Sequence, residues 1–153
     1  VITALYLTLI AAFTFGLFNL KERFYSFNRN NIVKVSVLIA ARNEQNNIEK
    51  LLQSLYNQSF PKELFEVIIV NDHSTDDTDK VINNFISNNK DINIQLLEAD
   101  KVGKKHAISQ ALHTAVNELI IVTDADCILN SLWIENIVGF YQDDFSAGAV
   151  IAC

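Results

Sequence analysis

Residues 35–44 of the chain read VSVLIAARNE, an apolar run rich in β-branched residues that ends in polar side chains. The apolar part predicts a strand that is buried on both faces of a sheet. Residues 65–70 (FEVIIV) and 119–123 (LIIVT) repeat the pattern, residues 93–97 form a weaker strand, and residues 147–152 begin another. Strands that alternate with helical stretches over short connections predict an α/β fold: a mostly parallel, doubly wound sheet with helices on both faces.

Four stretches outside these runs carry apolar residues at helical spacing. They lie near residues 48–56, 81–86, 104–116 and 131–141. The turn before the second of them reads NDHSTD, and its last residues can cap a helix. Together the strands and helices assign residues 35–153 to a single domain, which we expect to be incomplete at its C-terminal end.

The N-terminal stretch is a separate feature, because residues 1–20 contain no Asp, Glu, Lys, Arg or His. As a helix they would be about 30 Å long, which matches the hydrocarbon core of a bilayer. A cleaved signal peptide fits less well, since no charged region precedes the run. A buried core helix also fits less well, since the run has no polar face. We therefore predict a single transmembrane helix over residues 1–20.

Residues 21–34 follow as a juxtamembrane linker. They include the basic residues Lys21, Arg23, Arg29 and Lys34 against one acid, Glu22. Positive charge beside a span marks the cytoplasmic side of a membrane. We therefore expect a membrane protein whose catalytic domain is cytoplasmic.

Overall charge and cysteine content narrow the classes of function. The formal net charge of −6 argues against binding of nucleic acid, because proteins of that class usually carry a basic stripe. Cys127 and Cys153 lie far apart, without CxxC spacing and without a histidine at ligand spacing. Two core thiols in a reduced compartment are the simplest interpretation, although two cysteines can also form one bridge.

Polar clusters directly follow three of the predicted strands. They are Arg42, Asn43 and Glu44; Asn71, Asp72 and His73; and Asp124, Ala125 and Asp126. In an open α/β sheet, ligands bind outside the carboxyl ends of the strands. We therefore expect the three clusters to meet at one rim of the sheet and to form the functional site.

Asp124 and Asp126 are the sharpest of these features. Two carboxylates one residue apart form an oxygen-rich patch for Mg²⁺ or Mn²⁺, which take their other ligands from water and phosphate oxygens. A metal held there would offset the charge of a pyrophosphate and stabilise a departing nucleoside diphosphate. Solvated loop acids are the competing interpretation, and the position of the pair behind an apolar strand favours the metal.

Asp72 and the segment that begins at Gly103 supply further candidates. A carboxylate after a strand can accept hydrogen bonds from a nucleobase or ribose, and a local turn is the competing interpretation. We assign the helix cap to residues 74–77 and expect Asp72 to be free for a ligand. Gly103, Lys104 and Lys105 open a helix whose free N–H groups and basic side chains suit an anionic diphosphate, with a solvated basic turn as the alternative.

Four blocks, taken together, resemble family 2 glycosyltransferases in their order and spacing. They are VSVLIAARNE at residues 35–44, VIIVNDHSTD at 67–76, GKKHA at 103–107 and VTDAD at 122–126. The similarity covers residues 34–153. It implies the GT-A fold, a Rossmann-like nucleotide-sugar domain, and inverting transfer from a nucleoside-diphosphate sugar, commonly UDP-linked, with Mg²⁺ or Mn²⁺. Synthesis of a cell-envelope polysaccharide or glycolipid is the process implied, with the sugar and the acceptor undetermined.

The resemblance also implies roles for residues at the nucleotide end of the site. Asp72 matches the acid that contacts the base, and Lys104 matches a basic residue near the nucleotide. Ala40 falls where a backbone contact to the base is usual. Arg42 and Glu44 belong to the same loop as Ala40, and we include them among the substrate-binding candidates.

At the other end of the site, Asp124 and Asp126 match the D-x-D of the family, with Asp126 as the direct metal ligand. Asn71 and His73 stand where the family often has Asp and Gly, which implies a differently shaped turn. The family's catalytic base lies on a later acidic motif, which we expect beyond Cys153, so no catalytic residue is assigned. Asp143 and Asp144 follow the last predicted helix and should lie at the opposite edge.

Three other classes remain to be weighed. A dinucleotide-binding oxidoreductase needs G-x-G-x-x-G after the first strand, and the loop there contains no glycine. A receiver-like signalling domain would carry a covalent phosphate on Asp72. A module that binds metal and nucleotide without turnover shares every residue discussed above with the enzyme.

Overall fold

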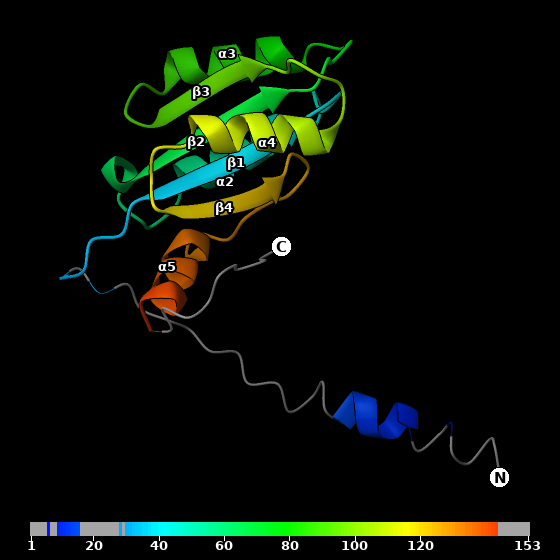
Figure 1. Cartoon of the computed structure of the whole chain (residues 1–153), viewed down its shortest axis with the longest axis vertical. Coiled ribbons are helices and arrows are strands. Elements are labelled where there is room, and N and C mark those ends of the chain that lie inside the picture. Colours follow the sequence, from blue (N-terminus) through cyan, green and yellow to red (C-terminus); the bar gives the residue numbers. More distant parts are fainter. Residues whose placement is uncertain (1–5, 7–8, 16–27, 29, 144–153) are drawn as a thin grey trace.

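The computed structural model describes residues 6, 9–15, 28 and 30–143 of the chain (Figure 1). Residues 9–15 are helical and exposed. Within the described residues, no helix combines the length and the apolar character that crossing a bilayer requires. The greater part of the transmembrane helix and linker that the sequence predicts lies outside the described residues.

The domain alternates strands and helices along the chain, as the sequence predicts. Its elements are β1 (Val35–Ala41), α2 (Ile48–Tyr56), the 3-10 turn η1 (Lys62–Leu64), β2 (Phe65–Asn71), α3 (Thr78–Asn88), β3 (Asn93–Glu98), α4 (Lys104–Thr114), β4 (Leu119–Asp124) and α5 (Trp133–Asp143). The predicted α/β class is thereby confirmed. The strand predicted over residues 147–152 lies outside the described residues.

The described strands form one parallel sheet with the order β3-β2-β1-β4. The chain steps from β1 to β2 to β3 in one direction and then returns to the far side of β1 as β4. The carboxyl ends of the strands are in register, with Ala41 opposite Asn71 and Ala40 opposite Asp124. Strand order therefore reverses beside β1, the place where open α/β sheets bind ligands.

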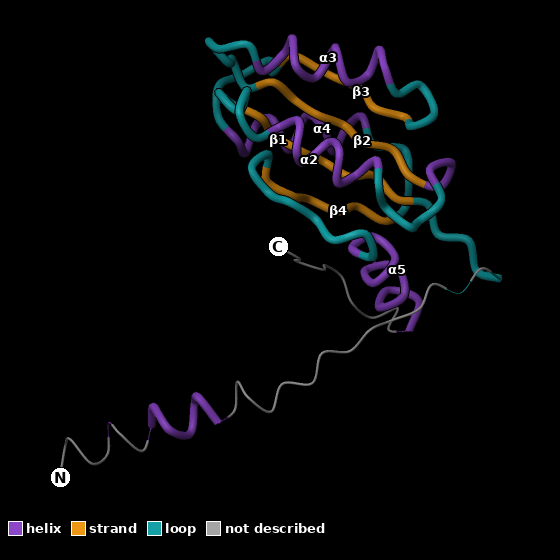
Figure 2. The backbone as a smooth tube through the Cα atoms, turned by 180° about the vertical axis from the view of Figure 1, so that it is seen from behind, coloured by secondary structure: helices purple, strands orange, loops and turns teal. Residues whose placement is uncertain are grey.

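Helices cover both faces of the sheet. Figure 1 shows α4 in front of the strands, and Figure 2, from behind, shows α2 and α3 over the opposite face. On the α2 face, the core includes Ile39 and Ile69 from the strands and Leu52 from the helix, all fully buried. The α4 face has a smaller core, where helical alanines meet Leu38, Ile68 and Val70.

Two helices begin or end at other residues than the sequence predicts. The last helix was expected over residues 131–141 but begins at Trp133, because the Asn130 side chain accepts the Leu132 amide in a preceding turn. Helix α4 was expected to reach residue 116 but ends at Thr114. The Val116 amide donates instead to a carboxylate on β2, which draws the chain away from the helix.

That carboxylate belongs to Glu66, which is only 4% exposed. It accepts hydrogen bonds from Ser36 Oγ (2.6 Å), from the Val116 amide (3.1 Å) and from Asn117 Nδ2 (3.2 Å). The donors come from β1 and from the connection between α4 and β4. Glu66 therefore holds the connection that leads into β4 against β1 and β2.

We expect Glu66→Ala to lower the free energy of unfolding by about 1–3 kcal/mol, because it removes the acceptor of the buried Ser36 hydroxyl and of two partly buried hydrogen bonds. Chemical denaturation checks this value. Glu63→Ala is the matched control: Glu63 is exposed on η1, and its loss should change stability by about 0.5 kcal/mol or less. Equal unfolding midpoints for the two variants would refute the role of Glu66.

Candidate functional site

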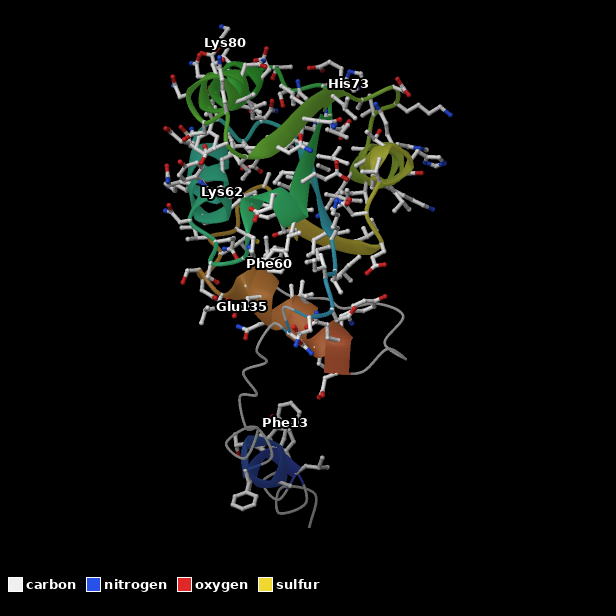
Figure 3. The ribbon with its side chains drawn as sticks, turned by 90° about the vertical axis from the view of Figure 1, so that its left-hand side faces the viewer. Phe13, Phe60, Lys62, His73, Lys80 and Glu135 are labelled. Atoms are coloured by element: carbon white, nitrogen blue, oxygen red, sulfur yellow. The ribbon has the colours of Figure 1, made fainter. Side chains whose placement is uncertain are left out.

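The carboxyl ends of the strands surround a cavity of about 450 Å³. In Figure 3, His73 marks this end of the sheet, and Phe60 lies toward the opposite end. The cavity is lined by Ala40, Ala41, Arg42, Glu44, Asp72, Gly103, Lys104, Asp124, Ala125 and Asp126. All seven site residues predicted from the sequence are in this set. Ala41 and Ala125 were not among the predicted site residues, although each adjoins one of them, and Gly103 was predicted as the start of a helix whose N–H groups suit a diphosphate.

A second hollow of about 580 Å³ lies along α2, between that helix and residues 128–131. None of the strand-end acids lines it. Asp143, at the end of α5, does not line the strand-end cavity either. The strand-end acids therefore gather at the switch point of the sheet.

Asp72 is the most deeply placed acid of the cavity, at 3% exposed. Its Oδ1 accepts the Gly103 amide at 2.8 Å, and its Oδ2 lies 3.8 Å from Arg42 Nη1. The expectation that Asp72 is free for a ligand was therefore wrong for one of its oxygens. The contact joins residues 31 positions apart, so no local pattern reveals it.

Gly103 has a φ of 118°, which residues other than glycine rarely adopt. A Cβ here would meet only the His106 ring, at 3.9 Å, so the backbone conformation and not crowding requires the glycine. The conformation aims the Gly103 amide at Asp72. Free N–H groups were expected at the start of this helix, and the Gly103 amide is not one of them, since Asp72 accepts it.

Lys104 begins α4 and crosses to the neighbouring strand. Its Nζ lies 2.6 Å from Asp124 Oδ1, and both side chains are more than half exposed. The turn of Gly103 and Lys104 thus connects two acids, Asp72 through a backbone amide and Asp124 through an ammonium group. Acids therefore lie at both ends of the cavity, and Lys104 lies between them.

Asp124 is the last residue of β4, and Asp126 follows after one buried alanine. Both side chains are exposed, and both line the cavity at the carboxyl end of β4. Among the described residues, no three His, Cys, Asp or Glu side chains gather closely enough to hold a metal by themselves. Two exposed carboxylates fit a hard divalent cation that takes its remaining ligands from water and phosphate, which is the usual pattern for Mg²⁺.

The loops after β1 and β2 are joined by reciprocal hydrogen bonds. The Asn43 amide donates to Ser74 Oγ, while Asn43 Oδ1 accepts the Thr75 amide. Two residues after Asn43, the Gln45 amide donates to Asp76 Oδ2. These contacts hold Arg42 and Glu44 against the residues that follow Asp72. The sequence showed only a polar turn here and did not reveal that two loops are paired.

Asp76 is the anchor of this pairing. Its Oδ1 accepts both the amide and the hydroxyl of Thr78, and the hydroxyl lowers the pKa of the Asp76 carboxyl from its ordinary value of 3.8. A carboxyl with a lowered pKa stabilises the fold above its unfolded pKa and loses that effect as the pH falls through its folded pKa. The two loops therefore remain joined at neutral pH.

The structure also explains how the chain accommodates His73 and Asn71, the two residues that depart from the family pattern. His73 has a φ of 55°, a left-handed conformation that glycine adopts readily, so the imidazole-bearing residue is held there at a cost in strain. The expectation of a differently shaped turn stays a prediction. Asn71 Nδ2 donates to both carboxylate oxygens of Glu98, each at 3.1 Å. An aspartate at that position would instead repel Glu98.

Comparisons with known proteins show which family this chain resembles. Residues 36–153 match the family described as "Glycosyl transferase family 2". The probable glycosyltransferase YdaM of Bacillus subtilis is 32% identical over 126 residues, which is 81% of this chain and 30% of YdaM. The poly(ribitol-phosphate) beta-N-acetylglucosaminyltransferase TarS of Staphylococcus aureus is 30% identical over 75% of this chain and 20% of TarS. The chain thus spans less than a third of these relatives.

Two solved structures resemble the fold. The mannosyltransferase PcManGT from Pyrobaculum calidifontis, in complex with GDP-Man and Mn²⁺, has a TM-score of 0.72 and 28% identity over 80% of this chain and 36% of that chain. Residues 1–349 of S. aureus TarS, in complex with UDP-GlcNAc, have a TM-score of 0.64 and 25% identity over 78% of this chain and 37% of that chain. The GT-A-like character of the described domain follows from these matches.

Proposed function

Because this chain belongs to glycosyltransferase family 2, we propose that it binds a nucleoside-diphosphate sugar for inverting transfer, with a UDP-sugar as the donor. The convergence of seven separately predicted residues on one cavity carries this proposal. Complexes of related proteins with UDP-GlcNAc and with GDP-Man support it. The polymer-modifying activity for which TarS is named supports a role in building a cell-envelope polymer, and a glycolipid is the other product class that we include.

At the nucleoside end we assign Asp72, Arg42, Ala40 and Glu44. Asp72 Oδ2 accepts hydrogen bonds from the base, while Oδ1 stays with Gly103. Arg42 is exposed and lies close to Asp72, so it can turn toward the base or the ribose. Ala40 presents backbone groups at the end of β1. Glu44, half-buried and paired with Asn47, holds the loop beside them.

At the opposite end we assign Asp124 and Asp126 to a divalent metal, with Asp126 as the direct ligand. When bound, Mg²⁺ or Mn²⁺ would supply positive charge that stabilises the departing diphosphate. Lys104 adds a basic group between this end and Asp72. The residues of this chain thereby bind and orient the donor, with positive groups beside its phosphates and a carboxylate beside its base.

Inverting transfer joins an acceptor oxygen to the anomeric carbon as the bond from that carbon to the diphosphate breaks, and a base takes the proton of the acceptor hydroxyl. We assign that base to none of the cavity residues, since each acid there has a role toward the donor. The receiver-like alternative is disfavoured because the chain belongs to a glycosyltransferase family and because Asp72 Oδ1 already accepts the Gly103 amide.

We further propose that residues 1–20 anchor the protein in a membrane, with the domain on the cytoplasmic side. The uncharged run and the basic residues of the linker support this placement. Donor nucleotides and a membrane-bound acceptor would then reach the cavity from the same side. The same proposal divides the chain into a transmembrane helix at residues 1–20, a linker at residues 21–34 and the nucleotide-sugar-binding domain from residue 35 onward.

We expect Mn²⁺ to strengthen UDP binding to the wild-type chain, and we expect Asp126→Asn to remove that effect. Loss of one charged contact should weaken metal-dependent binding about tenfold or more. Titration calorimetry of the full chain in detergent, with and without Mn²⁺, measures both affinities. Asp100→Asn is the matched control, because Asp100 is exposed and does not line the cavity. If wild type and Asp126→Asn depend equally on Mn²⁺, the assigned role is wrong.

A further inference from the structure

The ion pair between Lys104 and Asp124 occupies the metal end of the cavity. Lys104 Nζ and Asp124 Oδ1 are 2.6 Å apart, and Asp126 is the other acid of the proposed metal pair. An ammonium group in contact with one of two acids provides part of the positive charge that a divalent cation would bring. We propose that Lys104 is the resident counter-ion of Asp124 and that an arriving divalent metal displaces it.

The exposure of the pair makes this exchange feasible. The Lys104 and Asp124 side chains are 62% and 55% exposed, and exposed ion pairs contribute little net stability. A doubly charged cation near both Asp124 and Asp126 attracts them more strongly than a single ammonium group does. Displacement therefore costs little, whereas a buried pair would have resisted it.

The backbone around Lys104 stays in place while the side chain moves. The Gly103 amide is held by Asp72, and Ala107 and Ala111 of α4 are fully buried against the sheet. A flexible four-carbon stem lets the ammonium group turn without moving the helix. Once released from Asp124, Lys104 can face an anionic diphosphate in the same cavity. Metal binding thereby makes a second positive group available to the nucleotide.

This inference rests on the proposed function and makes a more specific claim about the order of contacts. The same lysine opposes the metal when no nucleotide is bound and supports the nucleotide when the metal is present. One substitution should therefore move two affinities in opposite directions. A lysine that only bound phosphate would change the second affinity and leave the first unaltered.

The test is calorimetry of the full chain with MnCl₂ alone, followed by UDP at saturating Mn²⁺. Lys104→Met should raise the affinity for Mn²⁺ alone about twofold to fivefold. The same variant should weaken UDP binding about tenfold at saturating Mn²⁺. Lys104→Arg keeps the counter-ion and should leave the Mn²⁺ affinity near that of wild type. Lys101→Met is the matched control, because Lys101 is exposed in the same connection but does not line the cavity.

The outcomes separate the two proposals. If Asp126→Asn abolishes Mn²⁺ binding while Lys104→Met leaves it unchanged, the exchange is overturned and the metal site stands. If Lys101→Met raises the Mn²⁺ affinity as much as Lys104→Met does, the effect is one of overall charge and the exchange is again overturned. If the wild-type chain binds no Mn²⁺ at all, both the metal site and the exchange are wrong.

Discussion

Asp72→Ala should weaken UDP binding about tenfold to a hundredfold, with or without Mn²⁺. The substitution removes the carboxylate that we assign to the base. It also leaves the Gly103 amide without its acceptor, so the turn that carries Lys104 loses its attachment to β2. Both consequences reduce affinity, and the loss of the carboxylate at the base does not depend on the metal. Calorimetry with UDP in the presence and absence of Mn²⁺ measures the loss.

Two further variants control for indirect effects. Asp72→Asn keeps an oxygen for the Gly103 amide and should preserve the fold while it weakens base recognition. Asp77→Ala removes an exposed acid of the same loop, one that pairs with Lys80 at the surface, and should leave UDP affinity unchanged. Wild-type affinity in Asp72→Ala would show that the nucleoside binds elsewhere.

Leu38→Ala should lower the free energy of unfolding by about 2–5 kcal/mol. Leu38 is fully buried on β1 and belongs to the small core beneath α4, with Ala107 and Ala111 from the helix. Because alanines cannot fill the space that Leu38 leaves, a cavity should remain. The start of α4 carries Gly103 and Lys104, so the same variant should also loosen the cavity. Denaturant unfolding monitored by circular dichroism gives the free energy.

Val122→Ala is the control for this prediction. Val122 lies opposite Leu38 in the register of β1 and β4, but it is 42% exposed. Its truncation removes little buried area and should change stability by about 1 kcal/mol or less. If Leu38→Ala unfolds at the same denaturant concentration as Val122→Ala, the core beneath α4 contributes less than its burial indicates.

The sequence was sufficient to place three strands of the sheet and the residues at their ends. β1, β2 and β4 are short apolar runs, and β1 and β2 are covered on both faces as such runs predict. The prediction of full burial was wrong for β4, which lies at the edge of the described sheet and has one partly exposed face. Because ligands bind at the carboxyl ends of parallel strands, the sequence then predicted that Asp72, Asp124 and Asp126 share one site. This step works because parallel strands share a direction, so the residue after each strand is at the same rim.

The partners of these residues could not be predicted in the same way. The contact from Gly103 to Asp72 depends on a left-handed backbone at Gly103 and on how closely α4 packs against the sheet. The pairing of the loops through Asn43 and Asp76 likewise depends on side chains that any polar turn could contain. Local patterns report which residues face a core or a rim, whereas hydrogen bonds between distant segments are set by the assembled fold.

The order of the strands has a consequence for the way the chain acquires its cavity during synthesis. β1 pairs with β2 on one side and with β4 on the other, so Val35 contacts both Phe65 and the much later Leu119. Until the ribosome has synthesised the segment after β3, the edge of β1 that pairs with β4 has no partner strand. Pairings between distant segments form slowly, because a long loop must close first. The half of the cavity that comes from β4 is therefore completed late, and a bound nucleotide would report that the described domain has finished folding.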